Sequence, residues 1–408
     1  MNRREFLAIC AAGTSPSRSA GAADLPRDIR ITRAVGFRVT SRRSKIAGKN
    51  SRLDVHGDRA TDRMVRLYTN KGIEGIGNCR AGEDRVAELV GANPFDFYRP
   101  AERRMVGPLG ASTMPLWDLA GKMLNKPAYE LLGGAGPTRV PVYDGSIYFA
   151  DLLGQYANRW QDRFRQEIDT GLALGHRAFK VKIGRGARWM KRGEGDARDV
   201  DVVKLIRKHA GSGIVIGVDA NNAYSLAGTK RFLERVGRDD IAFVEEMFPE
   251  AVGACLDLKR FIKTRGLKTL IADGETQHRL EAYKPFIQAK AIDIFQGDMN
   301  RFGFEGIATE AAWAKRQGLW VAPHNWGSLV GFYMQLHVGR AITNFYRAEH
   351  DPLTNDVLIA EGYEIKAGHA TVPNAPGFGL KIHEAKFATD AKITFDLKKG
   401  TGVFSRRE

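Results

Sequence analysis

The feature that most constrains the fold is a regular alternation of two patterns after about residue 140. Short apolar runs typical of buried strands alternate with stretches of helical period, such as Val200–His209 and Glu305–Gln317. Eight such alternations in about 210 residues predict an α/β fold with a (β/α)8-type barrel. A doubly wound sheet is the alternative, but the sequence lacks the glycine-rich phosphate loop that usually follows its first strand. The expected strands are Val140–Val142, Ala178–Ile183, Ile214–Asp219, Ala242–Glu245, Thr269–Ala272, Ile292–Gln296, Trp320–Pro323 and Phe345–Ala348.

The region before this alternation has a different texture. Alternating residues predict strands at 31–37 and 64–69, with a polar, basic loop between them over about Ser41–Asp62. Apolar residues at helical spacing predict one helix over Met114–Leu132, ended by a glycine pair. Residues 26–135 are therefore expected to form a compact α+β unit ahead of the barrel.

Ionisable residues follow seven of the eight expected strands. Counted from Lys182 at the end of the second strand, they are separated by 37, 26, 30, 23, 26 and 25 positions. Each interval is about one β-α unit, and the carboxyl ends of parallel barrel strands meet on one face. A single charge at a strand end is usually solvated, but seven in phase predict one common site. The residues are Lys182, Asp219, Glu245, Glu275, Asp298, His324 and Glu349.

Three of these residues, Asp219, Glu245 and Glu275, are carboxylates on adjacent expected strands. Carboxylates brought this close repel one another unless a cation neutralises them. Oxygen ligands on a rigid frame suit Mg²⁺, with waters or substrate oxygens completing its octahedron. The sequence therefore predicts a Mg²⁺ cofactor held by these three side chains.

Proton-transfer groups flank the expected metal site on both sides. Lys180 and Lys182 face the same way because strand side chains alternate, and the metal and the neighbouring ammonium should lower the pKa of Lys182 towards working pH. On the other side, Asp298 should fix the tautomer of His324 and support its protonated form. A substrate carboxylate at the metal would then lose its α-proton to a base. Glu349, if protonated or suitably oriented, would hydrogen-bond the developing enediolate.

Together these residues resemble the enolase superfamily and, within it, the mandelate racemase subgroup. The resemblance covers about residues 30–385, because Leu116–Gly134 and Pro373–Leu380, outside the barrel, are similar as well. The muconate-lactonising subgroup is disfavoured, since the lysine it would have at the end of the sixth strand is replaced by the segment Gln296–Asn300. The motifs that carry the resemblance are Lys180-x-Lys182, Asp219-x-Asn221, Glu245-Glu246, Gly274-Glu275, Asp298 and His324.

The resemblance implies a capping domain built from the N-terminal region and the C-terminal tail. The boundaries expected are 26–135 for the capping domain, 136–354 for the barrel and 355–408 for the tail that returns to the capping domain. A homo-oligomer is also implied. By resemblance, Lys182 and the His324–Asp298 pair are catalytic, Asp219, Glu245 and Glu275 bind Mg²⁺, and Lys180, Asn221 and Glu349 assist at the substrate.

The function expected from this site is that of a Mg²⁺-dependent lyase. Removal of the proton next to a carboxylate, with loss of a β-hydroxyl protonated by His324, would convert an acid sugar into a 2-keto acid. If the substrate lacks that hydroxyl, the same groups would act as a racemase or epimerase. A non-catalytic periplasmic acid-binding protein is a further alternative, but a pure binder has no need of both proton-transfer groups.

The basic loop between the first two strands is expected to select the substrate. Its side chains suit a small-molecule carboxylate that is polyhydroxylated or doubly charged, and its lack of aromatic residues argues against a benzylic one. An ordinary solvated loop is the alternative. His56 is a candidate contact to a substrate hydroxyl, whereas Trp326 is expected to pack. The loop residues are Arg42, Arg43, Lys45, Lys49, Arg52 and His56.

Charge and the N-terminus bear on partners and compartment. The net charge of +16 first suggests a nucleic-acid binder, but no zinc-finger, basic heptad or RNP-like motif accompanies it, and no nucleic-acid partner is expected. Residues 1–25 combine Arg3 and Arg4, a short apolar stretch and an Ala20-Gly21-Ala22 site, which resembles a twin-arginine signal peptide. A periplasmic location is expected, with a cytoplasmic one as the alternative. No stretch approaches ~18 uncharged apolar residues, so no stable membrane insertion is expected.

Overall fold

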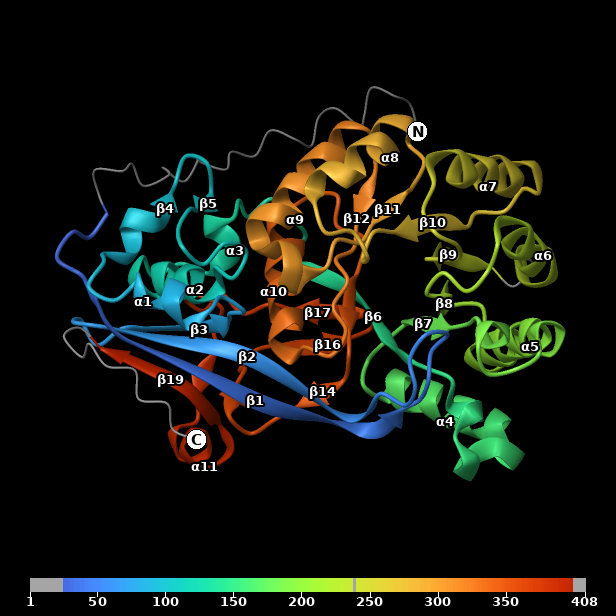
Figure 1. The fold of residues 1–408 in the computed structure, drawn as a ribbon, viewed down its shortest axis with the longest axis horizontal. Coiled ribbons are helices and arrows are strands. Elements are labelled where there is room, and N and C mark those ends of the chain that lie inside the picture. Colours follow the sequence, from blue (N-terminus) through green and yellow to red (C-terminus); the bar gives the residue numbers. More distant parts are fainter. Residues whose placement is uncertain (1–24, 238–239, 399–408) are drawn as a thin grey trace, which may run out of the picture.

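The computed structural model describes residues 25–237 and 240–398, so the signal-like segment predicted at residues 1–25 lies, apart from Leu25, outside the described residues. The described chain forms an antiparallel capping sheet with short helices and a parallel barrel surrounded by helices (Figure 1). The predicted fold class, an α/β barrel with a capping domain, is confirmed.

Eight parallel strands form the wall of the barrel. β6 to β12 pair in chain order, each with the next. The barrel closes because β13 pairs with β6, and Val321 of β12 forms a parallel bridge with Phe345, just before β13. Helices cover the outer faces of such strands, which explains why all five residues of β7 are buried. The strands are β6 (Arg139–Ile147), β7 (Ala178–Lys182), β8 (Val215–Asp219), β9 (Ile241–Glu245), β10 (Leu270–Asp273), β11 (Ile294–Phe295), β12 (Trp320–Val321) and β13 (Ala348–His350).

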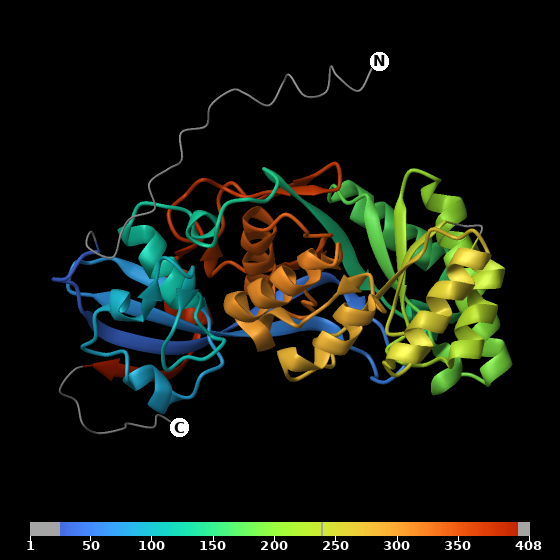
Figure 2. The same ribbon diagram turned by 90° about the horizontal axis from the view of Figure 1, so that it is seen from above.

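An α-helix follows each of the first seven barrel strands, and together these helices surround the barrel (Figure 2). The expected eighth alternation is wrong, because no helix separates β13 from β14 (Leu353–Thr354). β14 instead pairs with β1 (Ile31–Ala47) of the capping sheet, so the chain passes directly from the barrel to the capping domain. The helices are α4 (Trp160–Ala173), α5 (Arg192–Ala210), α6 (Leu226–Val236), α7 (Val252–Thr264), α8 (Lys284–Ala289), α9 (Met299–Arg316) and α10 (Leu329–Ala341).

The capping sheet joins the two ends of the described chain. β14, β1, β2 and β3 pair in that order, and β19 also pairs with β1. β19 runs antiparallel to Arg33–Arg38, so the tail completes a sheet that the N-terminal region begins. The remaining elements of the N-terminal region, with β19 and α11 of the tail, are β2 (Gly57–Thr69), β3 (Glu74–Asn78), β4 (Tyr98–Arg99), β5 (Arg104–Met105), α1 (Glu83–Ala87), α2 (Met114–Met123), α3 (Ala128–Leu131), α11 (Glu384–Asp390) and β19 (Lys392–Lys398).

The tail between β14 and α11 is fastened to both domains. One hairpin, β16–β17, adds to β6 of the barrel, and β15 and β18 form a separate two-stranded antiparallel sheet. The buried carboxylate of Asp118 in α2 accepts hydrogen bonds from the backbone N–H groups of Ile76 and Phe378, at 2.8 and 2.9 Å. The tail is thereby held against the capping helices. Its strands are β15 (Leu358–Ile359), β16 (Glu364–Lys366), β17 (His369–Thr371) and β18 (Lys381–Ile382).

The β1–β2 hairpin corrects the predicted loop at Ser41–Asp62. β1 continues to Ala47 and β2 begins at Gly57, so the connection is only 48–56, and the hairpin reaches from the capping sheet to the barrel (Figures 1 and 2). At its tip, the Phe149 N–H donates to Lys49 O at 2.9 Å. Ser51 Oγ donates to Ala220 O at 2.7 Å. The connection therefore lies over the carboxyl ends of the barrel strands.

Two predicted helices also have different bounds. The helix expected over Met114–Leu132 is divided into α2 and α3, because Asn125 adopts a φ of 51° and Pro127 lacks the N–H that a continuous helix needs. The helix expected at Glu305–Gln317 begins earlier, at Met299. It kinks at Gly303, whose φ of 61° suits glycine, and a Cβ there would lie 2.1 Å from Ala111 O.

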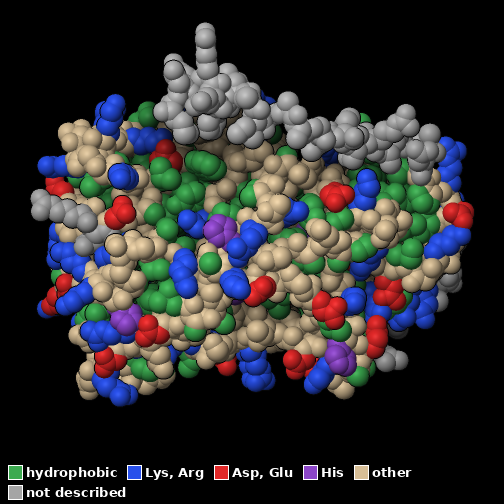
Figure 3. All heavy atoms as spheres, turned by 180° about the vertical axis from the view of Figure 1, so that it is seen from behind, with side chains coloured by type: hydrophobic (Ala, Val, Ile, Leu, Met, Phe, Trp, Pro, Cys, Tyr) green, Lys and Arg blue, Asp and Glu red, His purple; other side chains and the backbone are tan. Residues whose placement is uncertain are grey.

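Charged groups of both signs are mixed on the molecular surface. On the face drawn in Figure 3, lysine and arginine side chains alternate with acidic and hydrophobic ones. Within the described residues, each helix is too short or too polar to cross a bilayer.

Candidate active site

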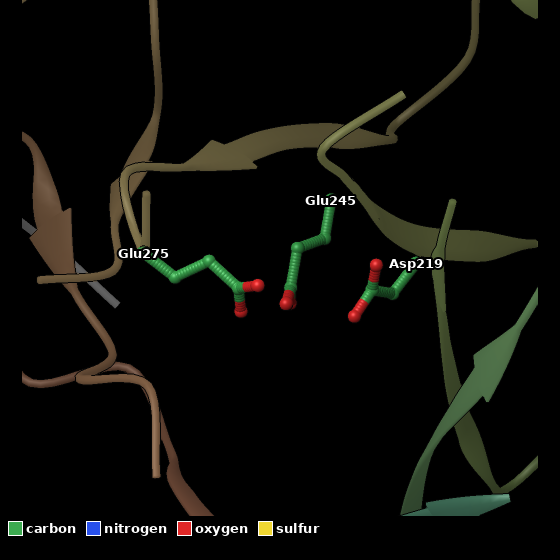
Figure 4. Close-up of side chains that lie close together, drawn as sticks. All are labelled: Asp219, Glu245 and Glu275. Atoms are coloured by element: carbon green, nitrogen blue, oxygen red, sulfur yellow. The ribbon is translucent and has the colours of Figure 1, made fainter. Parts of the chain in front are cut away.

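The strand ends bring the three predicted metal ligands together. Asp219 ends β8, Glu245 ends β9 and Glu275 lies two residues after β10, and their side chains point towards one another (Figure 4). One carboxylate oxygen of each lies within 4.8 Å of the others. Oε2 of Glu275 is buried and accepts no hydrogen bond, and its nearest charged neighbour is His324 Nε2 at 3.1 Å. Hard oxygen donors with an unsatisfied oxygen among them fit a Mg²⁺ ion.

A second group of carboxylates, Glu246, Glu250 and Asp273, is equally compact. Protein donors already bind its oxygens, however. Glu246 accepts from the carboxamides of Asn221 and Asn222, and Asp273 accepts from the Gly274 N–H. Glu250 accepts from Thr276 Oγ1 at 2.8 Å. The first group, which has the unsatisfied oxygen, is therefore the better candidate metal site.

Lys180 lies at the buried centre of the barrel as a fixed cation. Its Nζ is 2.6 Å from Glu245 Oε1, 2.8 Å from Glu349 Oε1 and 3.3 Å from Asp219 Oδ2. Burial opposes the charged form, but Glu245 and Glu349 outweigh it and hold the pKa of Lys180 well above its usual value. A permanently charged ammonium can neutralise nearby negative charge, but it cannot accept a proton.

Lys182 points the same way as Lys180, and Asp219 is its closest partner. Its Nζ donates to Asp219 Oδ2 and, at 3.0 Å, to Asn221 Oδ1. With the protein groups alone the pKa of Lys182 is raised, whereas the predicted lowering included the charge of a bound metal and stays a prediction. Burial is the largest effect and lowers the pKa, as Lys180 also does, but Asp219 together with Glu275 and Glu245 outweighs them and raises it. The sequence could not show how closely Asp219 approaches the ammonium.

Asp298 and His324 form a hydrogen-bonded pair at the opposite side of the carboxylates. Asp298 precedes the first residue of α9, and its Oδ1 accepts the Arg301 N–H at 2.9 Å as a helix cap. Its Oδ2 lies 2.8 Å from His324 Nδ1. A carboxylate can only accept, so Nδ1 carries hydrogen and the other ring nitrogen, Nε2, is left for chemistry.

The Nε2 atom of His324 faces the metal-ligand group. It lies 3.1 Å from Glu275 Oε2 and 4.0 Å from Glu349 Oε2. Burial opposes protonation, but Glu275, Asp298 and Glu349 outweigh it and raise the pKa of His324 to about 10. The raised pKa favours the protonated imidazole, the form that can act as an acid.

Glu349 and Asn221 complete the predicted set. Burial raises the pKa of Glu349, but Lys180 and His324 lower it below its usual value. This direction favours the carboxylate form of Glu349 over the protonated one, and the predicted contact of a suitably oriented Glu349 with the enediolate stays a prediction. Asn221 links Lys182 to Glu275, to which its Nδ2 donates at 3.4 Å. Its φ of 44° is uncommon for a residue other than glycine, as is often found at functional sites.

Two further residues belong to this site and were missed from the sequence. Gln296 donates from Nε2 to Glu245 Oε2 at 2.6 Å, and its own Oε1 is buried without a partner. The ring of Tyr148 lies 5.3 Å from Lys182 Nζ. Both residues directly follow barrel strands. A search of the strand ends for neutral polar residues, in addition to ionisable ones, would therefore have found them.

His56 and the basic residues of the hairpin separate into two groups. His56 lies against Tyr148 and Trp326 beside the barrel mouth, and Arg52 donates from Nε to Asn221 O at 2.8 Å. The others lie on β1 or pair elsewhere: Arg42 is exposed, Arg43 pairs with Asp351, Lys45 with Glu167 and Lys49 with Asp54. The predicted loop is therefore wrong for Arg42, Arg43 and Lys45, which lie on β1, whereas Lys49, Arg52 and His56 do lie in the connection and their contact with substrate stays a prediction.

Known proteins share this architecture. A family model described as "Enolase C-terminal domain-like" matches residues 163–386. Arabinonate dehydratase of Saccharolobus solfataricus is 29% identical over 275 residues, which are 67% of this chain and 69% of that protein. D-xylonate dehydratase of Haloferax volcanii is 25% identical over 351 residues, 78% and 82% of the two chains.

A solved structure extends the similarity to the whole molecule. Galacturonate dehydratase from Geobacillus sp., complexed with D-galacturonate and 5-keto-4-deoxy-D-galacturonate, is 30% identical with a TM-score of 0.81. The match covers 90% of this chain and 100% of that one. A mutant of the same enzyme was solved with Mg. This chain therefore belongs to the enolase C-terminal domain-like family, within the enolase superfamily of metal-dependent dehydratases and racemases.

Proposed function

We propose that this protein is a Mg²⁺-dependent dehydratase that converts an acid sugar into a 2-keto acid. The observation that carries the proposal is the placement of Lys182 and His324 on opposite sides of Asp219, Glu245 and Glu275, at one barrel mouth. The names of the relatives, dehydratases of arabinonate, xylonate and galacturonate, support the reaction class.

Lys182 takes the α-proton of the substrate on Nζ in its neutral form. A bound Mg²⁺ would supply positive charge that polarises the substrate carboxylate and offsets the Asp219 charge that raises the pKa of Lys182. Asn221 accepts a hydrogen bond from Nζ and orients it. Lys180 stays charged and stabilises the negative charge that develops on the substrate carboxylate.

His324 acts at the β-carbon as the general acid. As the C–H electron pair forms the new C–C double bond, the bond to the β-hydroxyl breaks and Nε2 of His324 gives it a proton, so that water leaves. The resulting enol tautomerises to the 2-keto acid. Asp298 accepts from Nδ1 and keeps the imidazole in the orientation that this proton transfer needs.

A panel of aldonic, aldaric and uronic acids incubated with the enzyme and Mg²⁺ in D₂O tests this reaction. A 2-keto product supports dehydration. Deuterium at the α-carbon with the β-hydroxyl retained would instead indicate a racemase or epimerase, which the same two groups could also serve. Tight binding of one acid without either change would contradict both reactions.

We propose further that residues 1–25 direct export through the twin-arginine route, which carries folded proteins. The Arg3-Arg4 pair and the Ala20-Gly21-Ala22 site support this. Fractionation of cells that express the full chain should recover it in the periplasm, and Arg3→Lys with Arg4→Lys should retain it in the cytoplasm. Equal distribution of both forms would contradict export.

We also propose that the protein is a homo-oligomer, as the family resemblance implies. Sedimentation velocity should give a mass that is a multiple of 45.2 kDa, less any cleaved leader. A monomer across the micromolar range would contradict this.

A further inference from the structure

We propose that Trp326 fixes His56 in the tautomer that carries its hydrogen on Nε2, and that this N–H binds a hydroxyl oxygen of the substrate. His56 is then a binding residue and Trp326 a positioning residue. The role of His56 rests on the proposed function, because it concerns the same barrel mouth. The inference adds one property of the substrate: the acid carries, at one defined position, a hydroxyl oxygen that accepts a hydrogen bond from His56.

The tautomer follows from the hydrogen bond between the two rings. Trp326 Nε1 lies 3.2 Å from His56 Nδ1. An indole N–H can only donate, so Nδ1 must be the acceptor and carries no hydrogen. In a neutral imidazole the hydrogen then lies on Nε2. The surroundings favour the neutral ring, because burial, Lys182 and Arg43 lower the pKa of His56 to about 4.

The Nε2 atom of His56 has no partner within the protein. It is buried, and no hydrogen-bond acceptor among the described residues reaches it. A buried donor without a partner costs free energy, and native proteins seldom tolerate one unless a ligand or water satisfies it. An acceptor that arrives with the substrate would explain why this donor is left unpaired.

His56 lies on the same side of the site as Lys182, the proposed base. The substrate hydroxyl that His56 contacts should therefore lie on that side. The His56 ring lies edge-on to Tyr148, with 4.7 Å between the ring centroids. Lys182 Nζ lies 5.3 Å from the centroid of the same Tyr148 ring. Lys182 is also close enough to His56 to lower the pKa of its ring, so we infer that a substrate whose α-carbon is next to Lys182 has part of its hydroxylated chain near His56.

The wall behind His56 is rigid, so its N–H has a fixed direction. Trp326 stacks on Tyr148 with 4.5 Å between centroids and 26° between planes. Trp326 also contacts Arg43, whose guanidinium carbon lies 4.5 Å from the centroid of the Trp326 ring. Arg43 is held by Asp351 through two hydrogen bonds of 2.7 and 2.6 Å. A donor fixed in this way discriminates against a substrate that lacks the matching hydroxyl.

Nitrogen NMR of the histidine rings tests the tautomer in the wild-type protein without substrate. The His56 signals, assigned by their loss in His56→Gln, should show a hydrogen on Nε2 and none on Nδ1 at neutral pH. In Trp326→Phe, which keeps the stacking ring but removes its N–H, the two tautomers should mix. A hydrogen on Nδ1 in the wild type would overturn the role of Trp326.

Kinetics with deoxy analogues of the substrate test the hydroxyl contact. His56→Phe should lower kcat/KM for the hydroxylated acid by about 10- to 100-fold, with only a small effect on the one analogue that lacks the contacted hydroxyl. His56→Gln, which can place an N–H near the original one, should recover part of the loss. Trp326→Phe should give an intermediate loss, again confined to the hydroxylated acid.

The two possible failures are distinguishable. An equal loss for the acid and all of its deoxy analogues would show that His56 only packs, and would overturn the contact. Wild-type protein that turns over no acid would contradict the proposed dehydratase, while the NMR result would still decide the role of Trp326. Thermal unfolding of each variant separates these effects from a loss of folding.

Discussion

Lys182 and His324 approach the same carboxylates from opposite sides, and their surroundings raise the pKa of both. The consequence differs for the two groups. A raised pKa keeps His324 ready to give a proton, whereas Lys182 must lose one before it can act as a base. Because Asp219 is the largest cause of the rise at Lys182, a cation bound to that carboxylate would oppose it. A metal at this site would therefore be coupled to the proposed base through one side chain.

Removal of either proton-transfer group should stop product formation but leave different partial reactions. Lys182→Ala should lower product formation by about 10³-fold or more and abolish deuterium exchange at the α-carbon. His324→Asn should lower product formation similarly and retain exchange, because Lys182 still reaches the α-proton. NMR of the acid in D₂O measures both. Normal turnover by either variant would show that its role is misassigned.

Asp298→Asn tests the support of the imidazolium. The asparagine keeps the cap of α9 but removes the charge that helps to raise the pKa of His324. A lower pKa means that the acid form is lost at lower pH. The alkaline limb of the kcat/KM profile should therefore move down by about one pH unit or more. An unchanged limb, with unfolding like that of the wild type, would contradict the support assigned to Asp298.

Most barrel strands could be predicted because their apolar runs end in charged residues at a regular interval. The β1–β2 hairpin could not be predicted to its full length, since charged residues occupy its strands. Their partners lie far away in the sequence: Asp351 is 308 positions from Arg43, and Glu167 is 122 positions from Lys45. His56 and Trp326 were singled out from the sequence, but their contacts with each other and with Tyr148 could not be predicted for the same reason. A pattern within one strand carries no information about such contacts.

The kink in α9 at Gly303 predicts that a side chain at this position would destabilise the protein. Gly303→Ala should lower the free energy of unfolding by at least about 1–2 kcal/mol, because of its positive φ and the close approach of Ala111 O. Urea unfolding measures the change. Gly253→Ala in α7 is the control, since a Cβ there meets nothing within 4 Å. Equal stability of the two variants would show that the kink can relax.

The chain passes from the capping domain into the barrel and back again. A part of the capping domain, the β1–β2 hairpin, can therefore cover a site at the barrel mouth. N-terminal and C-terminal strands build the capping sheet together, so neither end can leave without opening it. Glu305 of α9 adds a direct link, because it accepts hydrogen bonds from the Met105 N–H and Trp117 Nε1, both at 3.0 Å. The hairpin that carries His56 is therefore anchored in the capping sheet at one end and, through Lys49 and Ser51, at the barrel mouth at the other.

Metal binding should consequently stabilise the whole molecule. With Mg²⁺ at 100 times its Kd, the free energy of unfolding should rise by about 2.7 kcal/mol, seen as a higher Tm that EDTA reverses together with activity. Glu275→Gln should remove most of this shift, because it takes away the ligand whose Oε2 accepts no hydrogen bond. Glu250→Gln, in the second carboxylate group, is the matched control and should keep the shift. The reverse result, a shift lost in Glu250→Gln and kept in Glu275→Gln, would move the metal to the second group. It would also separate the metal from Lys182 and His324, and the proposed dehydration would then lack its electron sink.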